Sequence, residues 1–489
     1  MPALAAPCLL WLAACSGTSH GQPGADGVSV APSSEVRQGQ IGAVLTVQRS
    51  AGGLSRASRA DLEDLTVAID PKSTDERLLV NVTVPHGAAL GPRTFTLETP
   101  SGTLTQPSAV EVTPITVGPA GDDASLGTRS APFRSLKQAL LVAGAGDTCL
   151  LQNGTYAATS GETWGYALPE PLTIEGESFA QTILEGPEQT SPGAPQAGTP
   201  ALAPSADLSL AQLSLTGFDV AVAATGPAQL SLQDVVIDGK SGVVAEGDGS
   251  SLKLTGGSID ASDFAVQLGD TCSGCSLSID STTLTESGDG PVVQVSKAAQ
   301  HSQLSLTQAQ IVGGVLVLDP TATVTLSGGV LTGGGVAPGL DFAGATLEAN
   351  GSAFRAASAP YGLSLRAGTI SLSDATVEGN QYGVYQLGGS SKVRGSKISG
   401  YASIGIYFAT GNMDLGTATE AGNNTFVGGS DNAYGIYVDT NTSPPTCSNT
   451  SFDGMVPDPG MVQAGIDLLF APSEYVLAAT KTITFFRVP

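Results

Sequence analysis

Three stretches of the sequence, spaced 22 residues apart, decide the fold: residues 208–216 read LSLAQLSLT, residues 230–238 read LSLQDVVID and residues 252–260 read LKLTGGSID. Each stretch opens with two leucines separated by one polar residue and then reaches a second apolar segment. Alternation of this kind in short segments is typical of β-strands with one buried face. Because the pattern returns at a fixed interval, the sequence predicts a repeat architecture.

The same pattern continues toward the C-terminus at less regular intervals, which widen first at Leu277 and Leu304. Further strand starts are Leu277-Ser278-Ile279, Leu304-Ser305-Leu306, Val324-Thr325-Leu326 and Ile370-Ser371-Leu372. A third strand in several repeats opens with glycine, at Gly362, Gly383, Gly405, Gly435 and Gly465. Three short strands in about 22 residues indicate a β-solenoid, because a propeller blade needs about 40 residues and leucine-rich repeats carry an Asn or Cys signature that is missing here.

A second kind of motif precedes the repeats. Residues 121–128 read GDDASLGT, residues 131–140 read APFRSLKQAL and residues 145–156 read AGDTCLLQNGTY. In this order the segments resemble the opening of the DUF1565 family, and the resemblance implies a right-handed parallel β-helix over residues 115–489. We expect Ser135 to cap a short helix that covers the open end of the solenoid core. A glycine-rich turn with paired acids, here Asp122 and Asp123, is typical of a structural turn.

Residues 27–114 form a different pattern, with short alternating runs separated by turn residues. Several strands of this length predict a β-sandwich. The segments VNVTVP at 80–85 and GPRTFTL at 91–97 resemble the last hairpin of immunoglobulin-like IPT/TIG modules. That resemblance implies a spacer or adhesion-type module.

Composition limits the partners. Among 489 residues, 63 are glycine and only 13% are charged, so long helices are not expected. The 44 acidic and 20 basic residues give a net charge of -24, which opposes nucleic acid, anionic lipid and polyanionic substrates. The net charge does not oppose neutral ligands or cations as partners.

The first residues have the pattern of an export signal. Residues 1–14 are apolar and uncharged, and they end in Leu-Ala-Ala before Cys15. This end resembles a bacterial lipobox, which implies that Cys15 is lipidated and that residues 15–26 form a flexible tether. Ser16 is not acidic, which by the same resemblance favours the outer membrane or cell surface. An ordinary signal peptide cleaved nearby is the alternative. The segment departs from the usual pattern of secretory signals in one respect, because no Lys or Arg precedes the apolar run.

No other segment approaches the roughly 18 to 20 apolar residues of a membrane span, so any membrane attachment is expected through the lipid alone.

The remaining cysteines are expected in different environments. The spacing of Cys272 and Cys275 favours a local disulfide over the alternative, a metal site. Cys149 is expected as a buried thiol and Cys447 in a loop.

An acidic stack is the first candidate site. Asp238 and Asp260 follow equivalent apolar pairs 22 residues apart, so they are expected on adjacent rungs, with Lys240 and Asp263 nearby. Stacked carboxylates raise a pKa or recruit a cation such as calcium. Pectate-lyase-like enzymes use carboxylates in this way, although the resemblance stops at architecture. A solvated acidic face is the alternative.

A tyrosine ladder is the second candidate. Tyr385, Tyr407 and Tyr437 each follow Gly and an aliphatic residue, so they are expected to point outward on successive rungs as a flat apolar strip. Such a strip could bind neutral sugar faces, or it could only stabilise the sheet. Tyr382 and Tyr434 would extend it.

A third candidate is the basic set Lys392, Arg394 and Lys397, with Arg366 adjacent, which we expect to be solvated charge on an edge strand. The sequence thus predicts an all-β protein, an immunoglobulin-like β-sandwich followed by a right-handed parallel β-helix. We expect a non-catalytic exported surface lipoprotein without a cofactor. It would bind a neutral polysaccharide or a surface protein, or have a structural role. The alternative is a polysaccharide lyase or glycoside hydrolase.

Overall fold

The computed structural model describes residues 28–31, 35–49, 52–187, 198–288, 290–417, 419–429, 434–438, 446–447, 450–453 and 486–487. The chain divides into two compact units, Met1–Thr113 and Pro114–Pro489. Both units are built from strands, so the expected all-β fold class is confirmed. Residues 1–27, which include Cys15 and the expected tether, lie outside the described residues, as do Gly465 and the side chains of Tyr434 and Tyr437.

The first unit is a β-sandwich of two four-stranded sheets. One sheet contains, in spatial order, β1 (Val28–Ala31), β3 (Ala43–Arg49), β6 (Arg77–Thr83) and β5 (Thr66–Ile69). The other contains β2 (Glu35–Arg37), β8 (Gly102–Thr113), β7 (Gly91–Thr99) and β4 (Arg59–Asp61). Val47 and Val80 of the first sheet share one buried cluster with Phe95 and Val110 of the second.

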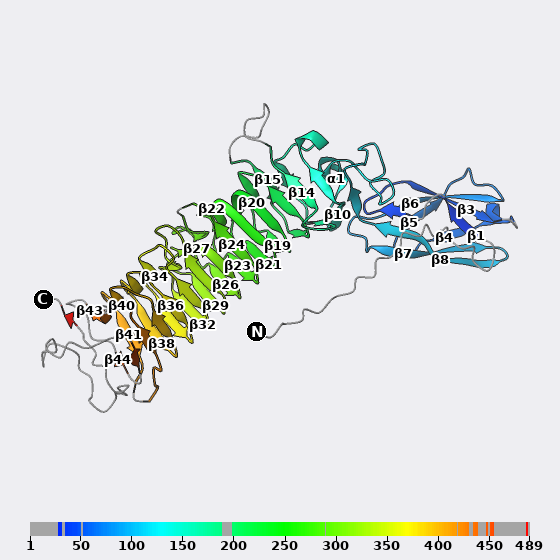
Figure 1. The fold of residues 1–489 in the computed structure, drawn as a ribbon. Coiled ribbons are helices and arrows are strands. Elements are labelled where there is room, and N and C mark those ends of the chain that lie inside the picture. Colours follow the sequence, from blue (N-terminus) through cyan, green and yellow to red (C-terminus); the bar gives the residue numbers. More distant parts are fainter. Residues whose placement is uncertain are drawn as a thin grey trace, which may run out of the picture. The chain divides into compact units, whose positions relative to one another are not determined.

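The second unit is a parallel β-helix (Figure 1). One of its sheets has 14 strands, from β9 (Ile115–Val117) to β44 (Thr446–Cys447), and the other has 24, from β11 (Gly154–Tyr156) to β46 (Phe486–Arg487). The 22-residue repeat sets the register, since Leu208 of β16 (Leu208–Ala211) pairs with Leu230 of β19 (Gln229–Gln233), which in turn pairs with Leu252 of β21 (Ser251–Thr255).

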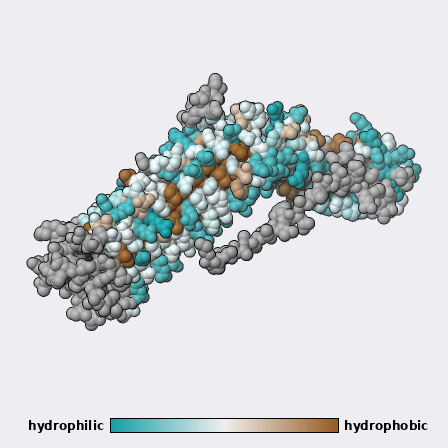
Figure 2. Space-filling model, viewed as in Figure 1, coloured by the Kyte–Doolittle hydropathy of each residue, from teal (hydrophilic) through white to brown (hydrophobic). Residues whose placement is uncertain are grey.

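The core of the β-helix is one continuous apolar cluster that extends from Ile115 to Ile436. Leu232 and Leu254 are 3% and 2% exposed, as the alternating pattern predicts. On the face drawn in Figure 2, hydrophilic and near-neutral residues cover most of the β-helix, with hydrophobic residues in a broken line. The described residues contain no helix that is long and apolar enough to cross a membrane.

A short helix, α1 (Leu136–Val142), packs Leu136 and Ala139 against the first rungs. The Ser135 hydroxyl accepts a hydrogen bond from the Gln138 amide at 3.2 Å, which is the expected N-cap. Asp123 accepts from the Ser135 amide and hydroxyl, both at 2.9 Å, so this acid has a structural role.

Among the cysteines, Cys272 and Cys275 form a disulfide, and Cys149 is a buried thiol outside it. Cys447 was expected in a loop, and that expectation was wrong. It lies in β44, where it pairs with Leu415 of β41 (Asn412–Leu415), because the 14-stranded sheet continues through this segment.

Candidate functional site

Three consecutive strands of the 24-stranded sheet carry the tyrosines: β34 (Tyr361–Leu365), β37 (Tyr382–Gln386) and β40 (Ile404–Phe408). Leu363, Val384 and Ile406 are aligned across these strands and buried, so alternation turns Tyr385 and Tyr407, which directly follow two of them, outward. Gly383, between Tyr382 and Val384, is required by packing. A Cβ on Gly383 would lie 2.5 Å from the Ile398 side chain and 2.6 Å from a backbone carbonyl.

Four tyrosines, Tyr361, Tyr382, Tyr385 and Tyr407, form what we call the tyrosine cluster. The rings of Tyr361 and Tyr385 stack with centroids 4.6 Å apart and planes at 23°, and those of Tyr385 and Tyr407 stack at 4.8 Å and 24°. The ring centroid of Tyr382 lies 5.6 Å from the ring centroids of both Tyr361 and Tyr385. These separations match the spacing of strands in a sheet, about 4.8 Å, so the rings repeat with the rungs.

The stacking corrects the expected flat strip. Because Tyr385 lies between Tyr361 and Tyr407, both faces of its ring are covered, and the cluster presents ring edges and hydroxyls to solvent. Tyr437 of β43 (Tyr434–Val438) is aligned with Tyr407, but its side chain is outside the described residues. Tyr361 was not predicted as a member of this site, although it begins a Tyr-Gly-aliphatic triplet like the one at Tyr382.

The hydroxyls of the cluster differ from those of buried tyrosines elsewhere. The Tyr156 hydroxyl donates to two backbone carbonyls, and the Tyr166 hydroxyl donates to a carboxylate. Within the part of the chain that the structure describes, the hydroxyls of Tyr361, Tyr382 and Tyr385 have no hydrogen-bond partner. These three half-buried groups are therefore available to water or to a ligand.

An ion pair lies beside the tyrosine cluster. Asp341 of β31 (Leu340–Phe342) is aligned with Ser364, which in turn is aligned with Tyr385. Arg366 Nε donates to Asp341 Oδ1 at 2.8 Å and a second guanidinium nitrogen donates to Oδ2. The Asp341 side chain is 11% exposed and that of Arg366 is 51% exposed. The buried carboxylate thus fixes an arginine that still faces solvent.

The electrostatics of this pair are balanced. The hydrogen bond that Arg366 donates to Asp341 raises the pKa of Arg366, so the arginine stays charged. Burial raises the pKa of Tyr361, and the neighbouring tyrosines and Asp341 add to that shift. Tyr361 is therefore uncharged at neutral pH, and the ion pair beside the cluster has no net charge.

The acidic stack has the expected register. Asp238 of β20 (Val236–Ala245) is aligned with Asp260 of β22 (Ser258–Leu268), and both are exposed. Lys240 Nζ lies 4.0 Å from Asp263 Oδ2, and both side chains are more than half exposed. Among the described residues, no group of three or more His, Cys, Asp or Glu side chains is placed to hold a metal ion. Calcium binding here stays a prediction.

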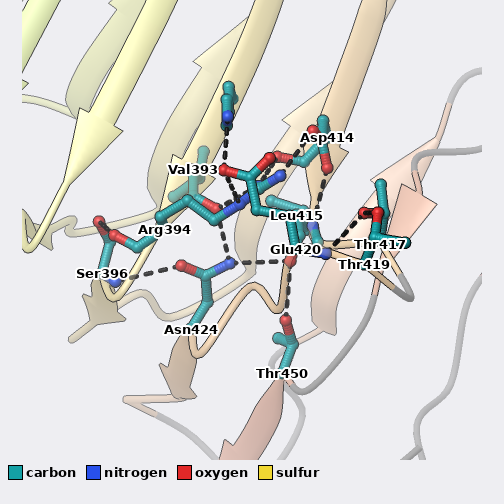
Figure 3. Close-up of polar contacts among 12 residues, drawn as sticks. Val393, Arg394, Ser396, Asp414, Leu415, Thr417, Thr419, Glu420, Asn424 and Thr450 are labelled. Carbon is teal, nitrogen blue, oxygen red and sulfur yellow. Dashed lines mark hydrogen bonds and ion pairs between the residues drawn. The ribbon is translucent and has the colours of Figure 1, made fainter. Parts of the chain in front are cut away.

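Two members of the basic set, Lys392 and Arg394, pair with acids that follow them in the sequence, and Figure 3 shows the network around Arg394. Arg394 Nη2 lies 2.6 Å from Asp414 Oδ2, and Lys392 Nζ lies 2.6 Å from Glu420 Oε1. The hydrogen bond from Lys392 lowers the pKa of the Glu420 carboxyl. These residues are joined into a structural network rather than an open basic patch.

The expectation of an edge strand was also wrong. Strand β38 (Ser390–Arg394) lies between β35 (Thr369–Ser373) and β41, because the repeat continues beyond it. Arg366 directly follows β34 of the other sheet and pairs with Asp341, so it does not join Lys392 and Arg394. Lys397 of β39 (Lys397–Ser399) is exposed.

Comparisons with known proteins give one family match and two weak structural similarities. A family model described as "Protein of unknown function (DUF1565)" matches residues 119–458. The A-module of Azotobacter vinelandii mannuronan C-5 epimerase AlgE4 is similar at 13% identity and a TM-score of 0.29, covering 64% of this chain and 87% of that one. Pectate lyase Pel9A is similar at 11% identity and a TM-score of 0.21, covering 72% and 82%. A search of the curated proteins found no match. Structural likenesses this low carry no argument about activity.

Proposed function

The chain belongs to the DUF1565 family, and from this premise we propose that it is a non-catalytic exported β-helix protein that binds a neutral polysaccharide at the tyrosine cluster. The observation that carries the proposal is the set of hydroxyls on Tyr361, Tyr382 and Tyr385, which have no partner among the described residues. Aromatic edges that end in hydroxyls offer both apolar contact and hydrogen bonds.

The charges favour a neutral ligand. The whole chain has a net charge of -24, which repels uronates and other polyanions. Arg366 is balanced by Asp341, so it contributes hydrogen-bond donors without a net positive charge. A sugar hydroxyl can accept from such a donor, and the phenolic hydroxyls can donate or accept. Binding by edges and hydroxyls replaces the ring-face stacking that the sequence alone suggested.

The test uses variants that preserve the stack. Tyr361→Phe, Tyr382→Phe and Tyr385→Phe together remove three hydroxyls and keep the rings, so melting should be nearly unchanged. We expect the wild type to be retained on at least one of immobilised cellulose, xylan or mannan, and the triple variant to lose that retention. Thr325→Val, which removes an exposed hydroxyl from β29 (Thr323–Ser327), is the matched control and should bind normally. Wild-type protein that none of these polysaccharides retains would refute the proposal.

The second candidate is a polysaccharide lyase or glycoside hydrolase that uses the acidic stack. The observation in its favour is the alignment of Asp238 with Asp260, with Lys240 and Asp263 close by. Their exposure counts against it, because catalytic acids are usually shifted by burial and by close charges. Release of reducing ends that disappears with Asp238→Asn and Asp260→Asn would favour this function.

A further inference from the structure

The stacked tyrosines are also placed for a covalent reaction with each other. We propose that Tyr385 is the centre of an oxidative cross-linking site, where a peroxidase-type one-electron oxidant joins its ring to that of Tyr361 or Tyr407 as dityrosine. This inference is independent of glycan binding. It rests on ring separations of 4.6 and 4.8 Å and on planes within 24° of parallel.

The geometry suits bond formation between ring carbons. Tyr385 and Tyr407 are aligned on adjacent parallel strands, so their rings leave the backbone in the same direction. The ring carbons next to each hydroxyl are therefore held near their counterparts on the neighbouring ring. The rings are half-buried, which restricts their motion, while their outer ends reach solvent. Proton loss to water is thus possible without opening the fold.

The reaction balances with hydrogen peroxide as the final oxidant. Each of two phenols gives one electron to the haem of a peroxidase and one proton to water, which leaves two tyrosyl radicals. The radicals pair as a carbon–carbon bond between positions ortho to the two oxygens. The hydrogens on those carbons then move to the oxygens and restore two phenols. In sum, two tyrosines and one hydrogen peroxide give one dityrosine and two waters.

The product would connect consecutive rungs of the β-helix. A bond from Tyr385 to Tyr361 joins β37 to β34, and a bond to Tyr407 joins β37 to β40. Such a link closes a loop of chain in the unfolded state, which lowers its entropy as a disulfide does. The cross-link is therefore expected to slow unfolding of this part of the β-helix.

The experiment treats the full chain with horseradish peroxidase and hydrogen peroxide at low protein concentration, and then isolates the monomer. Trypsin separates the three tyrosines into residues 356–366, 367–392 and 398–481. We expect mass spectrometry to find 367–392 joined to 356–366 or to 398–481, with the loss of two hydrogens and with fragment ions that place the bond on Tyr385.

Tyr385→Phe keeps the stacked ring but removes the phenol, so both peptide pairs should be lost. Tyr382→Phe is the matched control and should keep them. Wild-type monomer without these pairs, cross-links found only between molecules, or pairs that persist in Tyr385→Phe would each overturn the proposal.

Discussion

Glu162 is a buried acid whose hydrogen bonds form only in the folded protein. Its side chain is buried, and its carboxylate accepts from the amides of Leu136 and Lys137 at 2.7 and 3.2 Å and from the Tyr166 hydroxyl. Burial is the largest cause that raises its pKa above the ordinary value of 4.5. The folded state therefore binds this proton more tightly than the unfolded state.

The first prediction follows from that shift. The stabilising contribution of Glu162 protonation is complete below the unfolded pKa of 4.5 and is lost as pH rises through the higher folded value. Glu162→Gln should remove this pH dependence, and it should cost about 1–3 kcal/mol because an amide cannot replace both acceptor oxygens. Thermal unfolding of both proteins over a range of pH measures the effect. An unchanged pH slope in the variant would contradict the assignment.

Single residues were predictable where the signal is local. Ser135 precedes an apolar-periodic segment by one residue, and the structure shows the expected cap. Glu162 contacts an amide 26 residues away, and Arg366 contacts an acid 25 residues away. Such contacts depend on the irregular loops between rungs, which sequence spacing does not determine.

At the scale of elements, β19 tests the register of the whole sheet. Leu232 is 3% exposed, and the next residue, Gln233, points to solvent. Leu232→Asp should destabilise the protein by about 3 kcal/mol or more, because it puts an unpaired charge in an apolar core. Gln233→Asp adds the same charge outside and should change stability by less than about 0.5 kcal/mol. Equal melting temperatures for the two variants would disprove the register.

The elements of the β-helix were predictable because each rung repeats the same inward positions. Spacing of 22 residues placed Asp238 beside Asp260, and the structure has that register. The sequence did not predict that β38 lies inside its sheet. Its outer neighbour, β41, begins with Asn412-Met413-Asp414 and lacks the Leu-X-Leu pattern. The acid that neutralises Lys392 comes from the segment after β41.

At the scale of the whole molecule, the location of the protein is a prediction that rests on residues 1–14, which resemble an export signal and end before Cys15. We propose that it is anchored to the outer membrane or cell surface through lipid on Cys15. Cys15→Ala should move the protein from the detergent-extracted fraction to the soluble fraction, while Ser16→Ala should not. Mass spectrometry that finds no lipid on Cys15 of the wild type would contradict the anchor.

Composition and repeats predicted the architecture of the molecule but not the form of its surface. The sequence indicated that tyrosines share a column. Whether ring faces or ring edges meet solvent depends on side-chain rotation, which the stacking of Tyr361, Tyr385 and Tyr407 determines. The proposed ligand follows from that arrangement and from the balanced pair of Asp341 and Arg366.

The most direct test of binding without cleavage is to incubate the wild type with the neutral polysaccharide that retains it, and to measure bound protein and released reducing ends in the same sample over time. The account predicts saturable binding with no release above the buffer control. Steady release of reducing ends or unsaturated products, lost with Asp238→Asn and Asp260→Asn, would contradict it.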